Sequence, residues 1–232
     1  GEVGTRSQHL GNHCADGPKT SKETQKEIRL LVDPLEAHLM YAAGWLSFGL
    51  AHSILATATV KQRLASIFGA GYRLTYNLWA VVHIGAVWMF GSMALDTARF
   101  AFEPGMEPAL TAVRWLGIAV LLLALREYDL GRFSGLSQLR ARRQNQPDPG
   151  DEALVTHGMH QFVRHPLYLG AHLIFWGGAI NEFGLVTAIW GSLYLVIGAR
   201  HEEGALLALH GTPYETYKRR VPALLPWKGK VL

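Results

Sequence analysis

The sequence AHLMYAAGWLSFGLAHSILATATV, residues 37–60, decides the fold class of this chain. It contains no Asp, Glu, Lys or Arg, and neither does the stretch Leu74–Leu95. Because an α-helix rises about 1.5 Å per residue, each stretch is long enough to cross a hydrocarbon core of roughly 30 Å. Both stretches are therefore predicted to form membrane-spanning helices.

Three shorter apolar stretches follow these two. They are Ala109–Leu125, which Arg114 interrupts, Leu167–Asn181 and Phe183–Ala199. The whole set predicts an all-α fold, a polytopic membrane helix bundle of about five transmembrane helices. The stretch Leu167–Asn181 is the weakest member, because its length of about 22 Å is short for a full crossing. Only a few residues join it to the next stretch, which predicts a tight antiparallel hairpin.

The chain of 232 residues is short enough to form one domain. Residues 1–34 predict a polar, solvated extension without a secretory signal, and residues 35–232 form the predicted membrane domain. Cys14 is the only cysteine, so no internal disulfide is expected. The formal net charge is +4 and arises from Lys and Arg in loops, a pattern typical of a cytoplasmic membrane face. We expect membrane lipid, and no nucleic acid, as a partner; the sequence leaves the oligomeric state open.

Basic residues concentrate in loops 61–73 and 126–166 and in the segment after residue 199. The positive-inside rule places these segments in the cytoplasm. Five spans would then put the N-terminus outside, although five Lys or Arg residues precede residue 30. An even number of spans, with one hairpin that does not cross fully, would remove this conflict. The expectation is an integral membrane protein, of the inner membrane if bacterial, with its active site facing the cytoplasm.

A basic segment, Arg164-His165-Pro166-Leu167-Tyr168, opens the predicted hairpin. Pro166 suits the first turn of a helix, where a missing N–H costs nothing. The free backbone N–H groups of such a turn favour an anion, and Arg164 and His165 add positive charge. The alternative interpretation is a cytoplasmic helix cap with aromatic residues at the membrane interface.

The hairpin ends in Arg200-His201-Glu202-Glu203, directly after the last apolar stretch. The simplest interpretation is a helix that leaves the bilayer and becomes solvated. The residues that follow are more specific, because Gly211 is a suitable helix C-cap and Tyr214 lies one turn before a second tyrosine. Two prolines, Pro222 and Pro226, then predict a compact C-terminal segment.

Together these motifs resemble the isoprenylcysteine carboxyl methyltransferase superfamily. The similarity covers about residues 153–228 and includes Gly158-Met-His160-Gln-Phe-Val followed by the segment 164–170, then Glu202-Glu203 and the C-terminal tyrosines and prolines. The N-terminal half is less diagnostic and is similar to bacterial branches, which include the methanethiol S-methyltransferases and NnrU-like proteins. His160 departs from the family pattern, in which tyrosine is frequent at this position.

The resemblance implies that S-adenosylmethionine binds between the hairpin and the C-terminal helix, in a cytosolic C-terminal cofactor-binding region. The cofactor's carboxylate needs donors, its ribose hydroxyls and ammonium need acceptors, and its sulfonium is favoured near aromatic faces. Methyl transfer also needs a deprotonated acceptor, which a nearby guanidinium held by a carboxylate would favour. The expected catalytic residues are Arg200, which would lower the pKa of the acceptor or hold its anion, and Glu203, which would fix Arg200 from three residues away on the same helix face. The implied cofactor-binding residues are Gly158, His160, Arg164, His165, Pro166, Leu167, Tyr168, Glu202 and Tyr214.

The expected acceptor is a small or lipophilic thiol that enters from the bilayer. The alternatives are a prenylcysteine carboxylate as acceptor, a membrane reductase that binds a nicotinamide cofactor through arginines 140, 142 and 143, or a non-catalytic NnrU-like protein. His52 and His83 lie in the first two spans, where neutral histidines hydrogen-bonded between helices are expected, with Ser53, Tyr76 and Asn77 as candidate partners. The sequence has no cluster of histidines on an apolar helix face, so no metal site is predicted.

Overall fold

The computed structural model describes residues 23, 27, 32–147 and 154–228. Helices dominate these residues, and the isolated pairing of Arg99 with Asn181 is the only β-type contact among them. The predicted all-α class is therefore confirmed. Most of the predicted polar extension, residues 1–34, and Cys14 lie outside the described residues.

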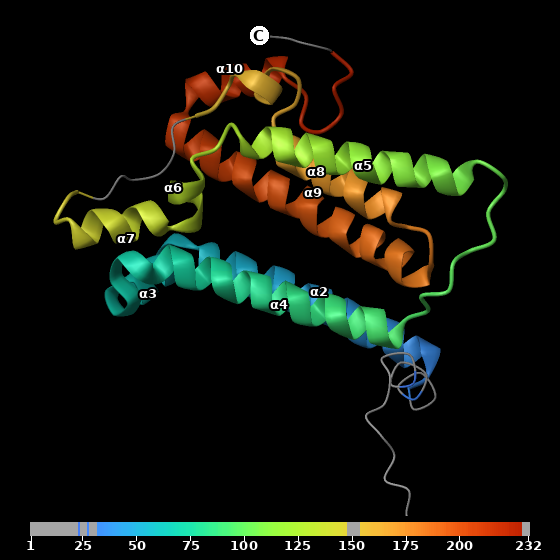
Figure 1. The fold of residues 1–232 in the computed structure, drawn as a ribbon. Helices are drawn as coiled ribbons and strands as arrows, with labels where there is room; N and C mark the ends of the chain where they lie inside the picture. Colours follow the sequence, from blue (N-terminus) through green and yellow to red (C-terminus); the bar gives the residue numbers. More distant parts are fainter. Residues whose placement is uncertain (1–22, 24–26, 28–31, 148–153, 229–232) are drawn as a thin grey trace, which may run out of the picture.

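Two layers of antiparallel helices build the bundle (Figure 1). One layer holds α2 (Pro34–Ala56) and α4 (Tyr72–Ala94), and the other holds α5 (Met106–Leu125), α8 (Pro166–Gly177) and α9 (Glu182–His210). Four helical stretches in the described chain are long and apolar enough to cross a membrane: α2, the stretch Thr59–Ala94 that contains α4, α5 and α9. The predicted membrane helix bundle is thus confirmed, whereas the count of five spans is not.

Helix α8 is the reason for the difference in span count. It has 12 residues, which give a length of only about 18 Å. It nevertheless reverses the chain direction, so that α2 begins and α9 ends at opposite ends of the bundle (Figure 1). The predicted hairpin is present, and its turn is fixed by Asn181, whose side chain accepts a hydrogen bond of 2.7 Å from the Gly184 N–H.

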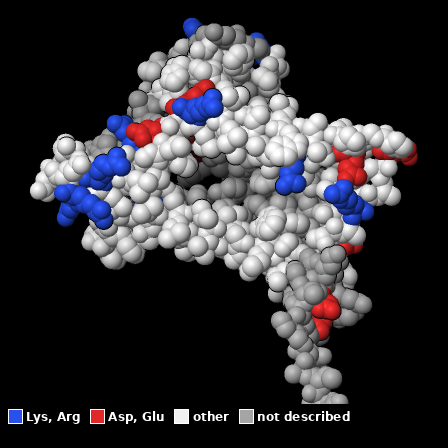
Figure 2. All heavy atoms as spheres, in the orientation of Figure 1, with Lys and Arg blue, Asp and Glu red and all other residues white. Residues whose placement is uncertain are grey.

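The two ends of the bundle differ in charge. The short helices α3 (Ala58–Phe68), η1 (Gly69–Gly71), α6 (Leu130–Ser134), α7 (Leu136–Arg143), η2 (Gly158–Gln161) and α10 (Thr212–Arg220) belong to the end where α9 finishes, which we call the basic end. Figure 2 shows Lys and Arg side chains gathered over part of this end, where α6 and α7 lie in Figure 1. The opposite, acidic end carries Asp33, Glu36, Asp96, Glu103, Glu107 and Glu182. This asymmetry is the one the positive-inside rule describes.

The outward faces of the long helices are apolar. Leu50 of α2, Val81 of α4 and Trp115 of α5 are each more than 60% exposed, which is expected of side chains that face lipid. Between the layers, Tyr41 of α2 packs against Phe183 of α9, and Trp45 and Phe48 of α2 pack against Tyr194 of α9. These aromatic contacts join the two layers toward the acidic end and leave space between the layers toward the basic end.

Candidate active site

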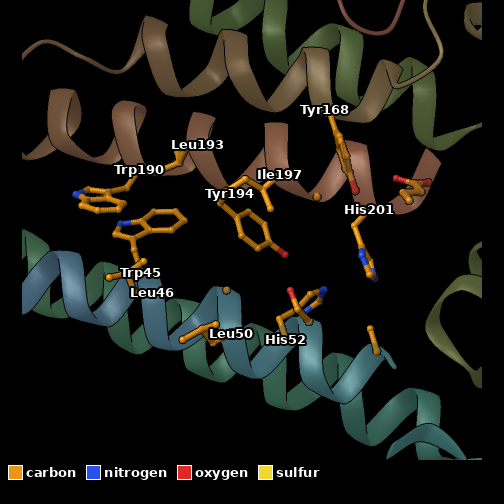
Figure 3. Close-up of a pocket in the computed structure, with 15 residues that line it drawn as sticks. Trp45, Leu46, Leu50, His52, Tyr168, Trp190, Leu193, Tyr194, Ile197 and His201 are labelled. Carbon is orange, nitrogen blue, oxygen red and sulfur yellow. The ribbon is translucent and has the colours of Figure 1, made fainter. Parts of the chain in front are cut away.

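A cavity of about 430 Å³ lies between α2 and α9 (Figure 3). Figure 2 shows the molecule hollowed between its two layers. The cavity is lined by Trp45, Leu46, Gly49, Leu50, His52, Ser53 and Ala56 of α2, Tyr168 of α8, and Trp190, Leu193, Tyr194, Ile197, Gly198, His201 and Glu202 of α9. The volume is within the range of small-molecule and cofactor sites, and most of the lining is apolar or aromatic.

The polar residues of the cavity gather toward the basic end. His52 comes from the last turns of α2, and His201 comes from the part of α9 that follows its apolar stretch. In Figure 3 both imidazoles point into the space between the two helices, with the Tyr168 ring beside His201. The cavity therefore joins an apolar part, between the long helices, to a polar part at the basic end.

Tyr168 reaches the cavity because α8 begins where the sequence predicts, with Pro166 in its first turn. The ring of His165 stacks on that of Tyr168, with ring centroids 5.2 Å apart and an interplanar angle of 11°. His165 Nδ1 also lies 3.6 Å from Glu202 Oε2. Burial, followed by the nearby Glu202 carboxylate, raises the pKa of the Tyr168 phenol, which therefore stays protonated. Both halves of the sequence motif thus meet at this end of the cavity.

Glu203 faces away from the cavity, into a cluster of basic side chains that we call the Glu203 cluster. Its Oε1 accepts hydrogen bonds from Arg164 Nε at 2.8 Å and lies 3.2 Å from His165 Nε2, and its Oε2 lies 2.8 Å from Lys218 Nζ. Arg164 and Glu203 are both about 90% buried. The expected pairing of Glu203 with Arg200 is therefore wrong: the carboxylate is taken by these three partners, and Arg200 is exposed outside the cavity lining.

The Glu203 cluster fixes the C-terminal segment against the start of α8. Arg164 N–H donates to the Pro222 carbonyl at 2.8 Å, and His165 N–H donates to the Ala223 carbonyl at 3.0 Å. The Arg164 guanidinium also donates to the Lys218 carbonyl at 3.0 Å. Because its donors are engaged within the fold, Arg164 acts here as a tie between segments and does not reach the cavity.

Tyr214 belongs to the same C-terminal structure. Its side chain is 1% exposed and packs against Tyr217, away from the cavity lining. Burial is the main cause that raises the pKa of Tyr214 to about 12. Tyr217 donates a hydrogen bond of 2.8 Å from its phenol to the His160 carbonyl. The structure therefore gives Tyr214 a buried core position outside the cavity lining.

His160 and Gly158 form a second buried unit behind the cavity. His160 Nδ1 lies 2.8 Å from Glu127 Oε2, its Nε2 lies 3.0 Å from Tyr128 Oη, and the Met159 N–H donates to Glu127 Oε1 at 2.7 Å. Gly158 has φ +59, and a Cβ there would lie 2.0 Å from Glu127 Oε1, so only glycine fits. Burial lowers the pKa of His160, so the ring is neutral at neutral pH.

The structure brings together some of the predicted site residues and separates others. Tyr168 and Glu202 line the cavity, and His165 touches both. Pro166 and Leu167 form the first turn of α8, with Pro166 fully buried. Gly158, His160, Arg164, Glu203 and Tyr214 surround the start of α8 without reaching the cavity.

Several cavity residues were not among the predicted site residues. Trp45, Trp190, Tyr194 and His201 line the cavity, and the sequence offers no signal for the first three beyond aromatic residues in apolar helices. Glu127 and Tyr128, which hold His160, were also missed, because they lie over thirty positions earlier in the chain. The predicted partner of His52 is confirmed as Tyr76, whose Oη lies 2.7 Å from Nε2.

Among the described residues, no group of three or more His, Cys, Asp or Glu is arranged to hold a metal ion.

Comparisons with known proteins place this chain in a protein family. A family described as "Protein of unknown function (DUF1295)" matches residues 70–220, which include α4 through α10. The chain belongs to the DUF1295 family. This DUF1295 protein is 30% identical to a methanethiol S-methyltransferase of Crocosphaera subtropica over 188 residues, 79% of this chain and 72% of the relative. It is also 30% identical to one of Mycobacterium tuberculosis over 183 residues, 78% of this chain and 74% of the relative.

A more distant relative extends the same relationship. The human protein-S-isoprenylcysteine O-methyltransferase is 29% identical over 139 residues, 56% of this DUF1295 chain and 48% of the human protein. No solved structure matches. The predicted membership of the isoprenylcysteine methyltransferase-like superfamily is confirmed. These relatives and the four apolar helices support a membrane methyltransferase.

Proposed function

We propose that this protein transfers a methyl group from S-adenosylmethionine to a small lipophilic thiol, at a site that faces the cytoplasm. The observation that carries the proposal is the cavity between α2 and α9. Its polar end contains Tyr168 and Glu202, one from each half of the sequence motif, and its apolar walls extend between helices that face lipid. The printed names of the bacterial relatives favour a thiol as the acceptor.

The residues at the polar end suit the chemical groups of the donor. Glu202 accepts hydrogen bonds and would hold the ribose hydroxyls or the ammonium group. The rings of Tyr168 and Tyr194 would face the sulfonium, which aromatic faces attract. His201 would bind the carboxylate. When bound, the donor supplies an activated methyl group, and the protein aligns the two reactants for an in-line displacement.

The acceptor would enter from the bilayer. Leu46 and Leu50 of α2 and Leu193 and Ile197 of α9 line the cavity, yet each is about half exposed or more, so they form both its wall and the outer surface of the bundle. A lipophilic thiol dissolved in the membrane thus has a short apolar path to the polar end. The arginines 140, 142 and 143 of α7, which were the expected contacts of a nicotinamide cofactor, do not line this cavity.

The proposal is tested by binding and by turnover of the purified protein in lipid nanodiscs. The protein is expected to bind S-adenosylmethionine but not NADPH, and to transfer radiolabelled methyl groups to methanethiol and other small thiols. Glu202→Gln should weaken donor binding by roughly tenfold or more. The matched control is Glu215→Gln, because Glu215 is an exposed carboxylate of α10 paired with Arg219 outside the cavity.

Each alternative gives a different result in the same assays. If the protein prefers to methylate a prenylcysteine carboxylate, the proposed acceptor is wrong but methyl transfer from S-adenosylmethionine still holds. Binding of NADPH alone would contradict the proposal, and binding of neither cofactor would indicate a non-catalytic membrane protein.

A further inference from the structure

His52 is the ionisable side chain of α2 that lines the cavity. It lies in the last turns of the helix, near the basic end, and in Figure 3 its ring points toward the space below His201. Ionisable groups within membrane helices are costly and mark functional sites. The acceptor thiol of the proposed reaction must lose a proton before it attacks, and neither Arg200 nor Glu203 lines the cavity.

Tyr76 is the hydrogen-bond partner of the His52 ring among the described residues. Tyr76 Oη lies 2.7 Å from His52 Nε2 and 3.1 Å from Nδ1, and also 3.5 Å from the His52 carbonyl oxygen. A neutral imidazole has one N–H donor and one lone pair. In the tautomer whose N–H donates to Tyr76 Oη, the other ring nitrogen carries the lone pair that can accept a proton.

We propose that His52 is the catalytic base that removes the proton from the acceptor thiol; this inference rests on the proposed function. The S–H bond breaks, its proton passes to the free nitrogen of His52, and the electron pair stays on sulfur. The thiolate sulfur then forms a bond to the donor methyl carbon as the bond from that carbon to the sulfonium sulfur breaks. The positive charge lost from the sulfonium is matched by the proton on His52, which is released to solvent at the basic end.

The surroundings of His52 suit a ring that becomes charged for a short time. Its centroid lies 5.5 Å from that of Phe48, 5.0 Å from that of Tyr76 and 6.1 Å from that of Tyr194. Aromatic rings around an imidazolium stabilise it without a fixed counter-charge, so proton release remains easy. The titratable side chains around this part of the cavity are Tyr72 and Tyr76 of α4, Tyr168 of α8, and Tyr194, His201 and Glu202 of α9.

The test compares two acceptors that differ in acidity. An alkanethiol is mostly protonated at neutral pH, whereas a thiophenol is largely ionised and needs no base. His52→Gln should reduce kcat roughly 100-fold with the alkanethiol and by less than about threefold with the thiophenol. Raising the pH should restore alkanethiol turnover of the variant, because solvent then ionises the thiol. Tyr76→Phe should give a smaller loss with the same preference, because it removes only the partner of the imidazole.

The control and the contradicting outcomes are well separated. His83→Gln is the matched control, because His83 is an intramembrane histidine bonded to Ser47 at 3.1 Å and outside the cavity lining; it should leave the ratio of the two rates unchanged. An equal loss with both thiols in His52→Gln, or a selective alkanethiol loss in His201→Gln instead, would overturn the assignment of the base. If the unaltered protein methylates neither thiol, the proposed function itself fails.

Discussion

Glu202 and Glu203 are adjacent in the sequence but serve different surroundings. A helix turns by about 100° per residue, so the Glu202 carboxylate lines the cavity while that of Glu203 enters the Glu203 cluster. Removing one member of a buried ion cluster leaves the remaining charges without compensation. A substitution of Glu202 should therefore affect donor binding, whereas a substitution of Glu203 should affect the stability of the fold.

Glu203→Gln is expected to lower the free energy of unfolding by about 3 kcal/mol, because Arg164 and Lys218 lose their counter-charge. Glu202→Gln should leave stability nearly unchanged, because its side chain is 45% exposed. Thermal unfolding in the same detergent checks both variants. Equal midpoints for the two would mean that the Glu203 cluster does not hold the C-terminal segment.

His160 should make the free energy of unfolding depend on pH. Burial holds its folded-state pKa below the ordinary value of about 6.5, so the unfolded chain binds a proton that the folded chain does not. Its contribution to stability is complete above that value and is lost as the pH falls through the lower, folded-state pKa. The midpoint of unfolding should therefore fall more between pH 7 and 5 in this protein than in His160→Tyr. The two profiles should be parallel if His160 is not buried neutral.

Helices α5 and α8 show how a short helix is held in the bundle. A Cβ at Gly117 would lie 2.7 Å from the Ile174 N atom, and one at Gly170 would lie 2.9 Å from the Leu121 N atom. The two backbones are therefore in direct contact, as small residues allow between membrane helices. This close packing stabilises α8, which is too short to cross a membrane.

Gly170→Val should force α5 and α8 apart and cost about 2 kcal/mol or more. Tyr168, two residues earlier, would then move, so donor affinity should fall together with the unfolding midpoint. The matched control is Gly85→Val in α4, where a Cβ meets nothing within 4 Å. A Gly170 variant with unchanged midpoint and affinity would contradict this role of the contact.

The whole molecule combines an apolar opening between its layers with a basic end. Leu193→Trp places a larger side chain in the cavity wall and should raise KM for the thiol severalfold with little effect on donor binding. Ile189→Trp is the matched control, because Ile189 lies one turn earlier on α9, has a similar exposure of 51%, and is outside the cavity lining. Similar KM values for both variants would argue against entry of the acceptor between α2 and α9.

The charge asymmetry predicts which side of the membrane the donor approaches. S-adenosylmethionine is charged and does not cross a bilayer, so inside-out vesicles should methylate thiols with externally added donor, whereas right-side-out vesicles should not. Permeabilised vesicles of either orientation provide the control. Activity restricted to intact right-side-out vesicles would reverse the orientation proposed here.

The sequence by itself determined the long membrane helices, the hairpin and the position of the motif, but not the number of spans. Long uncharged stretches such as residues 37–60 have no alternative to a helix in lipid, because every backbone polar group must be paired within the segment. The proline at the start of α8 and the turn at Asn181 are likewise local, since caps depend on the neighbouring residues. The superfamily followed from the same local motifs.

Only the tertiary structure decided what each motif residue does. The sequence cannot tell which of two adjacent carboxylates meets Arg164, because that depends on how α9 is rotated against α8 and α10. It also cannot bring Glu127 to His160, since these two residues come from separate elements more than thirty positions apart. Spacing along a helix fixes which face a residue occupies, whereas the packing of other helices fixes whether that face meets a cavity, a charge or lipid.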